Sequence, residues 1–370
     1  MRRDALLAVV IGLVAVVVTA GSWGETTQWH PDSLFYQAQL LEVRGVDRET
    51  ALARVLDGPL ADGVSARVHD SEWVAYNGDF YRRRWVVPAL GAAIEPVFGT
   101  DSLQVVSLVG YVLIGPLLFL LLRRRFGRLV SVLAALACIA LPSLRFWSAQ
   151  PLTDSFAVAL EALGLLAAVL VLDRSSRWLM LWAATVLALG FTRDATVVLV
   201  VAAAWVAFTE RTRRATWLLV TGVAAALPAP LLFGAPLQRS LALVVSGFDV
   251  PDDTGWGFIV RHYPGALWRL LSSDGHSLTR ATPVTGLVVV VALAALFVWR
   301  RRPDPYFAFV RAAAAGCALL LFLQPNPTGL RLELVFVPVL AVGLALAIEQ
   351  LSERLLRLRN ARAKPEPSSG

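Results

Sequence analysis

The feature that most constrains this chain is a succession of long apolar runs separated by short, arginine-bearing segments. A helix needs roughly 17–25 mainly apolar residues to cross the hydrocarbon core of a bilayer. With 57% hydrophobic and only 16% charged residues among 370, much of the chain requires lipid as its solvent. We therefore predict an all-α, polytopic membrane protein with about ten transmembrane helices. The candidate spans are residues 5–23, 102–122, 129–147, 156–172, 178–192, 195–209, 217–233, 284–299, 306–323 and 331–349.

The first span has two interpretations. Arg2 and Arg3 precede the apolar run, and Val18-Thr19-Ala20 resembles a weak signal-peptide cleavage site. We expect a retained helix, because the run continues to Trp23 and many further spans follow. The short pair at 178–209 is expected to be tilted or partly re-entrant.

The arginines orient these spans. Cytoplasmic segments carry more Lys and Arg than segments on the other face. With a cytoplasmic N-terminus, the short outward connections hold one arginine each, at Arg145, Arg193 and Arg331, and the cytoplasmic segments hold groups of them. Those groups are Arg123–Arg125 with Arg128, Arg174 with Arg177, Arg211 with Arg213 and Arg214, Arg300–Arg302, and Arg354, Arg357 and Arg359. We predict a multi-pass cell-membrane protein with both termini in the cytoplasm and long outward loops at 24–84 and 234–283.

The domain organisation follows from the same pattern. Residues 1–349 are expected to form one transmembrane domain, and 350–370 a cytoplasmic tail that is partly disordered, since its end is polar and rich in Pro and Ser. The apolar stretch 85–98 is short and contains Pro88, Glu95 and Pro96, so we predict an interfacial helix on the outer face.

Composition argues against several function classes. The net charge of +7 resides in clusters between apolar runs, which is typical of cytoplasmic loops and not of a nucleic-acid-binding surface. Both cysteines, Cys138 and Cys317, lie inside apolar spans, and no zinc spacing or phosphate-binding glycine loop is present. The sequence therefore indicates no metal ligands and no nucleic-acid partner; Asp252-Asp253 resembles a metal-binding pair but is typical of a solvated turn.

Charged residues gather at the outer ends of the predicted helices. Asp32 follows the first span, Asp154 begins the fourth, and Arg193-Asp194 occupies the turn after the fifth. Arg331 and Glu333 open the tenth. Helix ends can form a water-accessible binding site without exposing unpaired backbone groups to lipid. The alternative is that each aspartate is a helix N-cap, a position that Asp favours. His30 and Tyr36 flank Asp32, which makes capping a weaker explanation there.

Two further features border this face. Glu161 lies seven residues after Asp154, on the same face of the fourth span and ~10 Å deeper at 1.5 Å per residue. It either lines a cavity or is a protonated carboxyl that bonds between helices. Arg82, Arg83 and Arg84 bring positive charge to the outer surface, which favours binding of a phosphate or of anionic lipid.

Together these motifs resemble the GT-C membrane glycosyltransferases. The resemblance rests on an acidic residue after the first span, a long first outer loop, the arginine-proline step of YRRRWVVP, the PLTDS and TRD turns, and the final span with Arg331 and Pro338. The final span opens with Arg-Leu-Glu and not with the commoner Arg-Tyr. The chain also resembles a set of actinobacterial membrane proteins, which indicates no particular substrate.

The resemblance implies a polyprenyl-phosphate-linked sugar as donor and an envelope glycan, lipid or protein as acceptor. It implies Asp32 as general base and Asp154 as the residue that supports or positions the acceptor. His30 would tune Asp32 or contact the sugar. Arg331 or Arg82–Arg84 would hold the donor phosphate. Tyr36, Glu161, Arg193 and Asp194 are the other expected substrate-binding residues. No cofactor is implied, and no motif supports a divalent metal.

Three other functions stay open. A transporter or flippase would place substrate nearer the midplane, between internal repeats; Glu161 favours it, but no repeat is present. A ligase or polymerase of envelope polysaccharide would use the same outward site with another donor. A scaffold would use the long loops as docking surfaces.

Overall fold

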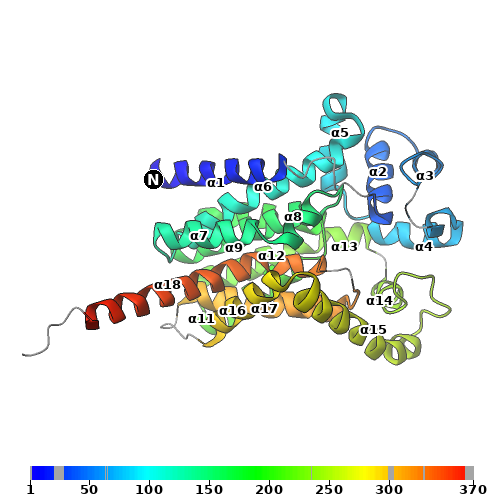
Figure 1. The fold of residues 1–370 in the computed structure, drawn as a ribbon. Coiled ribbons are helices and arrows are strands. Elements are labelled where there is room, and N and C mark those ends of the chain that lie inside the picture. The colour runs from blue at the N-terminus through cyan, green and yellow to red at the C-terminus, as the bar shows by residue number, and fades with distance from the viewer. Residues whose placement is uncertain are drawn as a thin grey trace, which may run out of the picture.

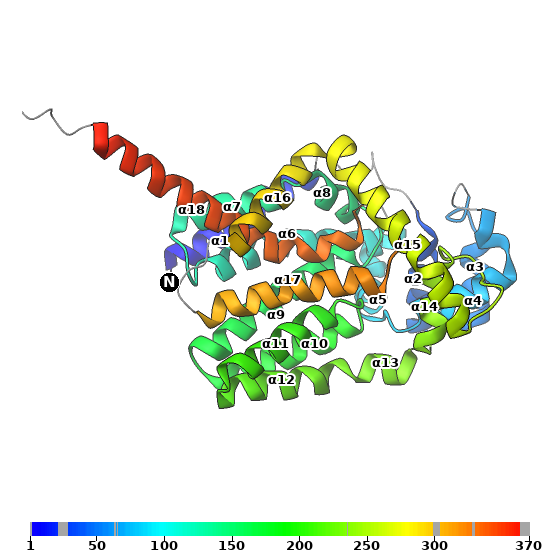
Figure 2. The same cartoon turned by 90° about the horizontal axis from the view of Figure 1, so that it is seen from below.

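The computed structural model describes residues 2–20, 29–62, 64, 66–234, 236–298, 304–327 and 330–362. Within these ranges every regular element is a helix, which confirms the all-α prediction. The helices form an elongated bundle (Figures 1 and 2). The N-terminus and the end of α18 lie at one end of the bundle, here called the terminal end. Helices α2, α3, α4 and α14 lie at the opposite end, called the loop end.

Several helices are long and apolar enough to cross a membrane. Six single segments meet that description, or up to eight if each of two bent helix pairs is one span. The chain is therefore a multi-pass membrane protein. The single segments contain α1 (Arg2–Ala20), α6 (Ser102–Leu122), α9 (Asp154–Asp173), α12 (Arg213–Ala226) with α13 (Pro228–Phe233), α17 (Pro305–Leu323), and α18 (Val337–Arg362).

The predicted count of ten spans is not confirmed. The expected span 129–147 is a bent pair, α7 (Arg128–Ile139) and α8 (Pro142–Ser148), at 59°. The expected span 284–299 is α16 (Pro283–Val298), which meets the helix before it at 110°. Helices α10 (Leu179–Gly190) and α11 (Thr196–Glu210) are apolar but short, as the pair at 178–209 was expected to be. Proline at the start of α8 and α16 lacks the N–H that would continue the preceding helix.

Helix α5 (Val86–Phe98) is joined to α6 through the 3₁₀ turn η2 (Gly99–Asp101), with no intervening loop. The two helices do not form one straight rod, because α5 packs back against the start of α6. A Cβ on Gly91 of α5 would lie 3.0 Å from the Leu103 side chain of α6. Glycine permits the positive φ of 56° at Gly99 between the two helices. The location of α5 at a membrane interface stays a prediction.

The two long loops fold into helices that pack on each other. The first contains α2 (Pro31–Val43), α3 (Arg48–Leu56), the 3₁₀ turn η1 (Ala66–His69) and α4 (Ser71–Tyr81). The second contains α14 (Leu237–Val245), α15 (Trp256–His276) and the π-helical turn η4 (Ser277–Ala281). The indole N–H of Trp73 donates to the carbonyl of Phe248 at 2.8 Å, and Arg239 Nη1 lies 3.1 Å from Asp79 Oδ2. These contacts place both loops at the loop end.

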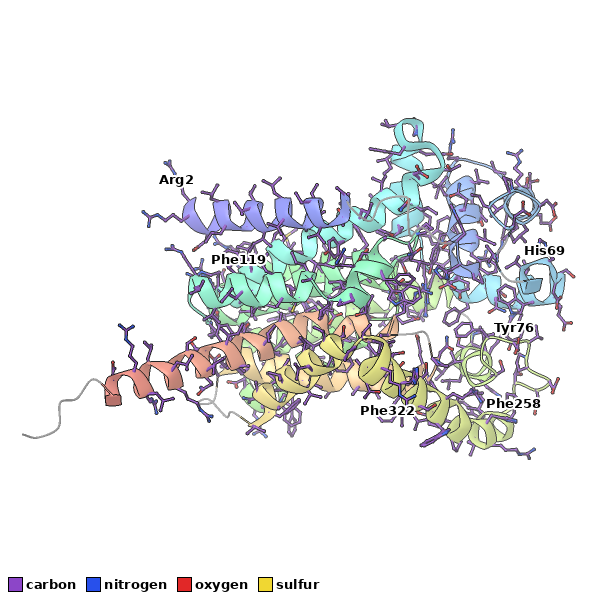
Figure 3. The ribbon with its side chains drawn as sticks, viewed as in Figure 1. Arg2, His69, Tyr76, Phe119, Phe258 and Phe322 are labelled. Carbon is purple, nitrogen blue, oxygen red and sulfur yellow. The ribbon has the colours of Figure 1, made fainter. Side chains whose placement is uncertain are left out.

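Ion pairs close the terminal end of the bundle. Arg125 lies between Asp173 at 2.8 Å and Asp304 at 2.7 Å, and Arg128 contacts Asp4 at 2.7 Å. Figure 3 shows Arg2 at this end and His69, Tyr76 and Phe258 at the other. Several positions fall outside the described residues: the expected extension of the first span at 21–23, the arginines at 300–302, and the predicted disordered end of the tail at 363–370.

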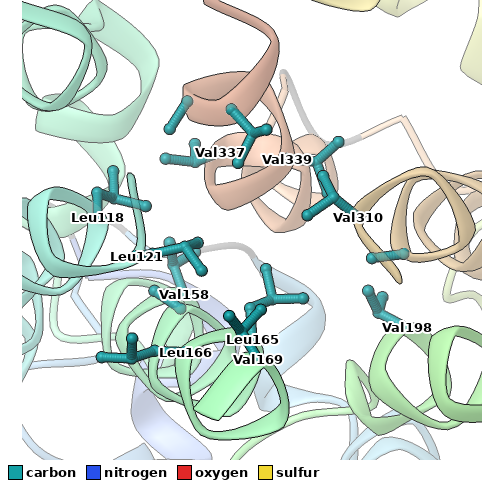
Figure 4. Packing of buried hydrophobic residues seen from close by; sticks show 14 of the residues in the cluster. Leu118, Leu121, Val158, Leu165, Leu166, Val169, Val198, Val310, Val337 and Val339 are labelled. Atoms are coloured by element: carbon teal, nitrogen blue, oxygen red, sulfur yellow. The ribbon is translucent and has the colours of Figure 1, made fainter. Parts of the chain in front are cut away.

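The bundle interior is aliphatic. Leucines and valines of α6, α9, α11, α17 and α18 interdigitate around its centre (Figure 4). On the surface, apolar side chains of α1 such as Leu6 (64% exposed) and Val17 (73% exposed) face outward, as a lipid-facing helix requires. Small residues allow close helix crossings. A Cβ on Gly110 of α6 would lie 2.6 Å from the backbone N of Phe156 in α9.

We expect Gly110→Ala to destabilise the protein by about 1–3 kcal/mol, because α9 would have to move away from α6. The measurement is the midpoint of thermal unfolding of the detergent-purified protein. Gly257→Ala in α15 is the matched control, because nothing lies within 4 Å of an added Cβ there. An equal loss of stability in both variants would contradict the close-crossing explanation.

Candidate functional site

Segments far apart in the sequence bring charged side chains together at the loop end of the bundle. They come from the start of α2, the α4–α5 junction, the start of α9, the α10–α11 connection and the segment before α18. The set contains four guanidinium groups and three carboxylates: Arg83, Arg84, Arg193, Arg331, Asp32, Asp154 and Asp194. We call these seven residues the charged cluster. Four positive and three negative charges leave one positive charge in excess.

Arg331 joins the two halves of the cluster. Its Nη1 lies 2.8 Å from Asp32 Oδ2, and its Nε donates to Asp154 Oδ2 at 3.0 Å. Its guanidinium also stacks over the Trp147 ring, 5.6 Å from the ring centroid. The planar fork of arginine suits such bridging of two carboxylates.

Asp32 is the accessible carboxylate of this bridge. It follows Pro31, the first residue of α2, so helix geometry fixes its position. Its side chain is 15% exposed, whereas that of Asp154 is 1% exposed. A substrate can therefore reach Asp32 more readily than Asp154.

Two tyrosines complete the surroundings of Asp32. Tyr81 donates its hydroxyl hydrogen to Asp32 Oδ1 at 2.8 Å, and Arg84 Nη1 donates to the Tyr36 hydroxyl at 2.6 Å. Burial, followed by the charge of Asp32, raises the pKa of Tyr81, which keeps this donor protonated. Burial alone would raise the pKa of Asp32, but Arg331, Arg84 and the Tyr81 hydrogen bond outweigh it and lower that pKa. Asp32 is therefore ionised at neutral pH.

Positive charge is crowded on the other side of the cluster. Arg193 pairs with Asp154, and Arg83 with Asp194, whose Oδ2 also accepts from Gln324 Nε2 at 2.9 Å. Burial, followed by the charges of Arg331 and Arg84, lowers the pKa of Arg193 to about 9. Burial, followed by Arg84, lowers the pKa of Arg83 to about 10. A bound anion would relieve this crowding.

His30 lies beside Asp32 as the N-cap of α2. Its ring centroid is 5.4 Å from that of Trp147, and its Nε2 is buried without a hydrogen-bond partner. Burial, followed by the charge of Arg331, lowers the pKa of His30, so the imidazole is neutral at neutral pH. It can exchange a hydrogen bond with a substrate but does not add charge.

A cavity of about 410 Å³ borders the cluster. Arg83, Asp194 and Gln324 form its polar side. Its remaining lining is mainly apolar and comes from α11, α13, α14 and α17, including Val197, Leu237, Leu241, Val244 and Leu320. We call it the arginine cavity. Its lining matches a ligand with an anionic end and an apolar body.

Two of the expected binding residues lie apart from the cluster. Arg82 is exposed at the C-terminal end of α4. Glu161 is fully buried in α9, and neither of its carboxyl oxygens has a hydrogen-bond partner. Asp32, Asp154, His30, Tyr36, Arg83, Arg84, Arg193, Asp194 and Arg331 lie together, as the sequence predicts.

The alternative of simple N-capping does not account for the three aspartates. The N-caps of α2, α9 and α11 are His30, Thr153 and Ala195. The carboxylates of the aspartates instead contact arginine, tyrosine and glutamine side chains. By contrast, Asp47 caps α3 and accepts from the Thr50 N–H at 2.9 Å.

Sequence reasoning missed Tyr81, Trp147 and Gln324. Tyr81 is the residue immediately before the three arginines, and Gln324 opens the turn before Arg331, so both lie next to charged motifs in the sequence. Nothing in the sequence indicated Trp147. In the described part of the chain, no group of three or more His, Cys, Asp or Glu side chains is placed to hold a metal ion.

Comparison with known proteins supports the fold. No protein-family model and no curated protein sequence matches the chain. Among solved structures, the chain is similar to ArnT from Cupriavidus metallidurans, crystallised with bound undecaprenyl phosphate, with a TM-score of 0.59 and 13% identity. The match covers 96% of this chain, which spans 63% of the length of that ArnT chain. At this identity the likeness shows a shared fold, in agreement with the expected GT-C-like architecture.

Proposed function

We propose that the protein is a membrane glycosyltransferase. It moves a sugar from a polyprenyl-phosphate donor to a hydroxyl of an envelope glycan, lipid or protein acceptor on the outer face. The observation that carries the proposal is the composition of the charged cluster, in which an accessible carboxylate, Asp32, lies among four arginines with one positive charge in excess. Sugar transfer from a phosphate needs both a base and a cation to receive the leaving group.

The acceptor proton goes to Asp32. As the acceptor oxygen forms a bond with the anomeric carbon, the bond from that carbon to the phosphate oxygen breaks, and the Asp32 carboxylate takes the hydroxyl proton. One carboxylate is sufficient because the phosphate leaves as a stable anion, unlike the two that most glycosidases use. Tyr81 positions the Asp32 carboxylate through its hydrogen bond.

The donor phosphate binds on the arginine side. Arg83 lines the arginine cavity, where an apolar wall is available to the polyprenyl chain. The undecaprenyl phosphate bound to ArnT supports a donor of this kind at the level of the fold. Arg331 is divided between Asp32 and Asp154, and a phosphate that attracts Arg331 would raise the pKa of Asp32 toward neutrality. Donor binding would thereby strengthen the base.

A transporter is the second candidate, favoured by the unpartnered carboxyl of Glu161 inside α9. Deletion of the gene distinguishes the two functions. If the protein is a transferase, deleting its gene removes one sugar linkage from the envelope, and the lipid-linked donor accumulates. An unchanged glycan profile would overturn the transferase proposal and leave the transporter.

We expect Asp32→Asn, expressed in the deletion strain, to lower transfer by about 10²–10⁴-fold, because Asn keeps the shape of the side chain but cannot accept the proton. The measurement is the restored sugar linkage by mass spectrometry of envelope glycans at matched expression. Asp47→Asn is the control, since Asn caps a helix about as well as Asp. Full restoration by Asp32→Asn would exclude the base role.

We expect Arg83→Gln to weaken binding of polyprenyl phosphate about tenfold or more, because a charge-assisted hydrogen bond is lost. The measurement is equilibrium binding of undecaprenyl phosphate to the protein in nanodiscs of phosphatidylcholine. Arg82→Gln is the matched control, with the same charge change at an exposed position one residue away. Equal weakening in both variants would indicate general attraction to anionic lipid.

A further inference from the structure

A second cavity, which shares no lining residue with the arginine cavity, has acidic polar groups. It measures about 370 Å³ and is bounded by the ends of α15 and α17, the starts of α16 and α18, and the break between α7 and α8. Its lining is almost entirely aliphatic, including Leu271, Leu278, Val289, Leu293 and Leu340. The polar exceptions are Asp274, Glu333, Thr285 and Ser143. We call it the acidic cavity.

The polar groups of this cavity are buried without partners. Asp274 is 8% exposed and Thr285 is 5% exposed. Asp274 Oδ1, both carboxyl oxygens of Glu333 and Thr285 Oγ1 are buried and have no hydrogen-bond partner. The two carboxyl groups interact with each other, and a proton shared between them would satisfy at most one oxygen of each. The remaining carboxyl oxygens would still lack hydrogen bonds. A buried polar atom without a hydrogen bond destabilises the folded protein, so such atoms are rare in native proteins unless a ligand or water bonds to them.

The charges around the cavity select the kind of ligand. A phosphate or carboxylate would be repelled by the two acids. An ammonium group would be attracted by the acids but repelled by the cluster, since Arg193 acts electrostatically on Glu333 and the cluster has an excess positive charge. Neutral hydroxyl groups satisfy the acceptors without introducing charge, and the aliphatic wall requires an apolar body beside them.

The cavity is connected to the proposed base through the segment before α18. Glu333 is two residues from Arg331, a backbone separation of at most ~7 Å, and Arg331 contacts Asp32. The same short segment therefore contributes one residue to the acidic cavity and one to the contact with Asp32.

We propose that the acidic cavity is the acceptor site and that Asp274 and Glu333 bind the hydroxyl groups of a neutral, lipid-anchored acceptor. This inference rests on the proposed transferase function. It identifies the acceptor as an uncharged, polyhydroxylated head on an apolar chain, and it separates the acceptor from the anionic donor by electrostatics.

The test uses a photoreactive octyl glucoside with a diazirine in its alkyl chain. The protein is held in phosphatidylcholine nanodiscs, and labelled peptides are mapped by mass spectrometry. We expect labelling within 271–278 or 334–340 that unlabelled octyl glucoside displaces. Glucose, which lacks the chain, and octyl phosphate, which is anionic, should not displace it at the same concentration. More effective displacement by octyl phosphate or by octylamine would overturn the neutral-hydroxyl assignment.

The variant for this test is Asp274→Leu with Glu333→Leu. We expect labelling to fall about tenfold or more, because hydrogen bonds to charged or proton-sharing carboxyls are lost. The unfolding midpoint should stay equal or rise, since apolar replacement of an unsatisfied buried pair is often neutral or stabilising. Unchanged labelling of the folded double variant would overturn the site.

Two further variants keep this test interpretable. Thr285→Val removes one hydroxyl of the cavity at nearly constant volume and should weaken labelling even if the double variant does not fold. Glu72→Leu, an exposed acid on α4, should leave labelling unchanged.

Failure of this inference is separable from failure of the proposed function. The labelling uses neither donor nor turnover. Normal sugar transfer by the double variant would reject the acceptor site alone. Specific labelling, combined with an unchanged glycan profile after gene deletion, would reject the transferase and with it the acceptor assignment.

Discussion

The buried guanidinium of Arg331 is the contact on which the arrangement of the loop end depends. It bonds to Asp32, near the start of the chain, and to Asp154, 177 positions before it. Removing one partner from such a buried pair typically costs 3–5 kcal/mol, because the remaining charge is left without compensation. The first long loop, the start of α9 and the entry to α18 are therefore held in one geometry by a single side chain.

That geometry has a chemical consequence, because the charges are not distributed evenly around Arg331. Positive charge is in excess where Arg83, Arg84 and Arg193 converge, whereas Asp274 and Glu333 line a separate cavity. The molecule therefore has two cavities that suit ligands of different charge. A transfer reaction between an anionic lipid and a neutral acceptor needs such a division, while a carrier of one substrate does not.

The membrane explains where this polar chemistry is located. Inside a bilayer, backbone groups must bond within the helix, so irregular chain is tolerated only at helix ends or against a polar cavity. The break between α7 and α8 and the bend between α15 and α16 both border the acidic cavity. At Gly110, in contrast, α6 and α9 cross too closely to admit a side chain.

The sequence alone determined the helical class, the membrane environment and most members of the cluster. Hydrophobic runs and arginine spacing can be read from each segment alone. Helix ends at the same membrane surface lie at a similar depth, so their polar residues lie near one another. The tertiary structure decided what depends on helix rotation and crossing. Of three consecutive arginines, Arg83 and Arg84 enter the cluster and Arg82 is exposed, because successive residues at the end of α4 point in different directions. Asp274 and Glu333 line one cavity although no motif relates them, and α5 packs back against the start of α6. Such pairings arise from packing between distant segments, and periodicity within one segment does not determine how it packs against another.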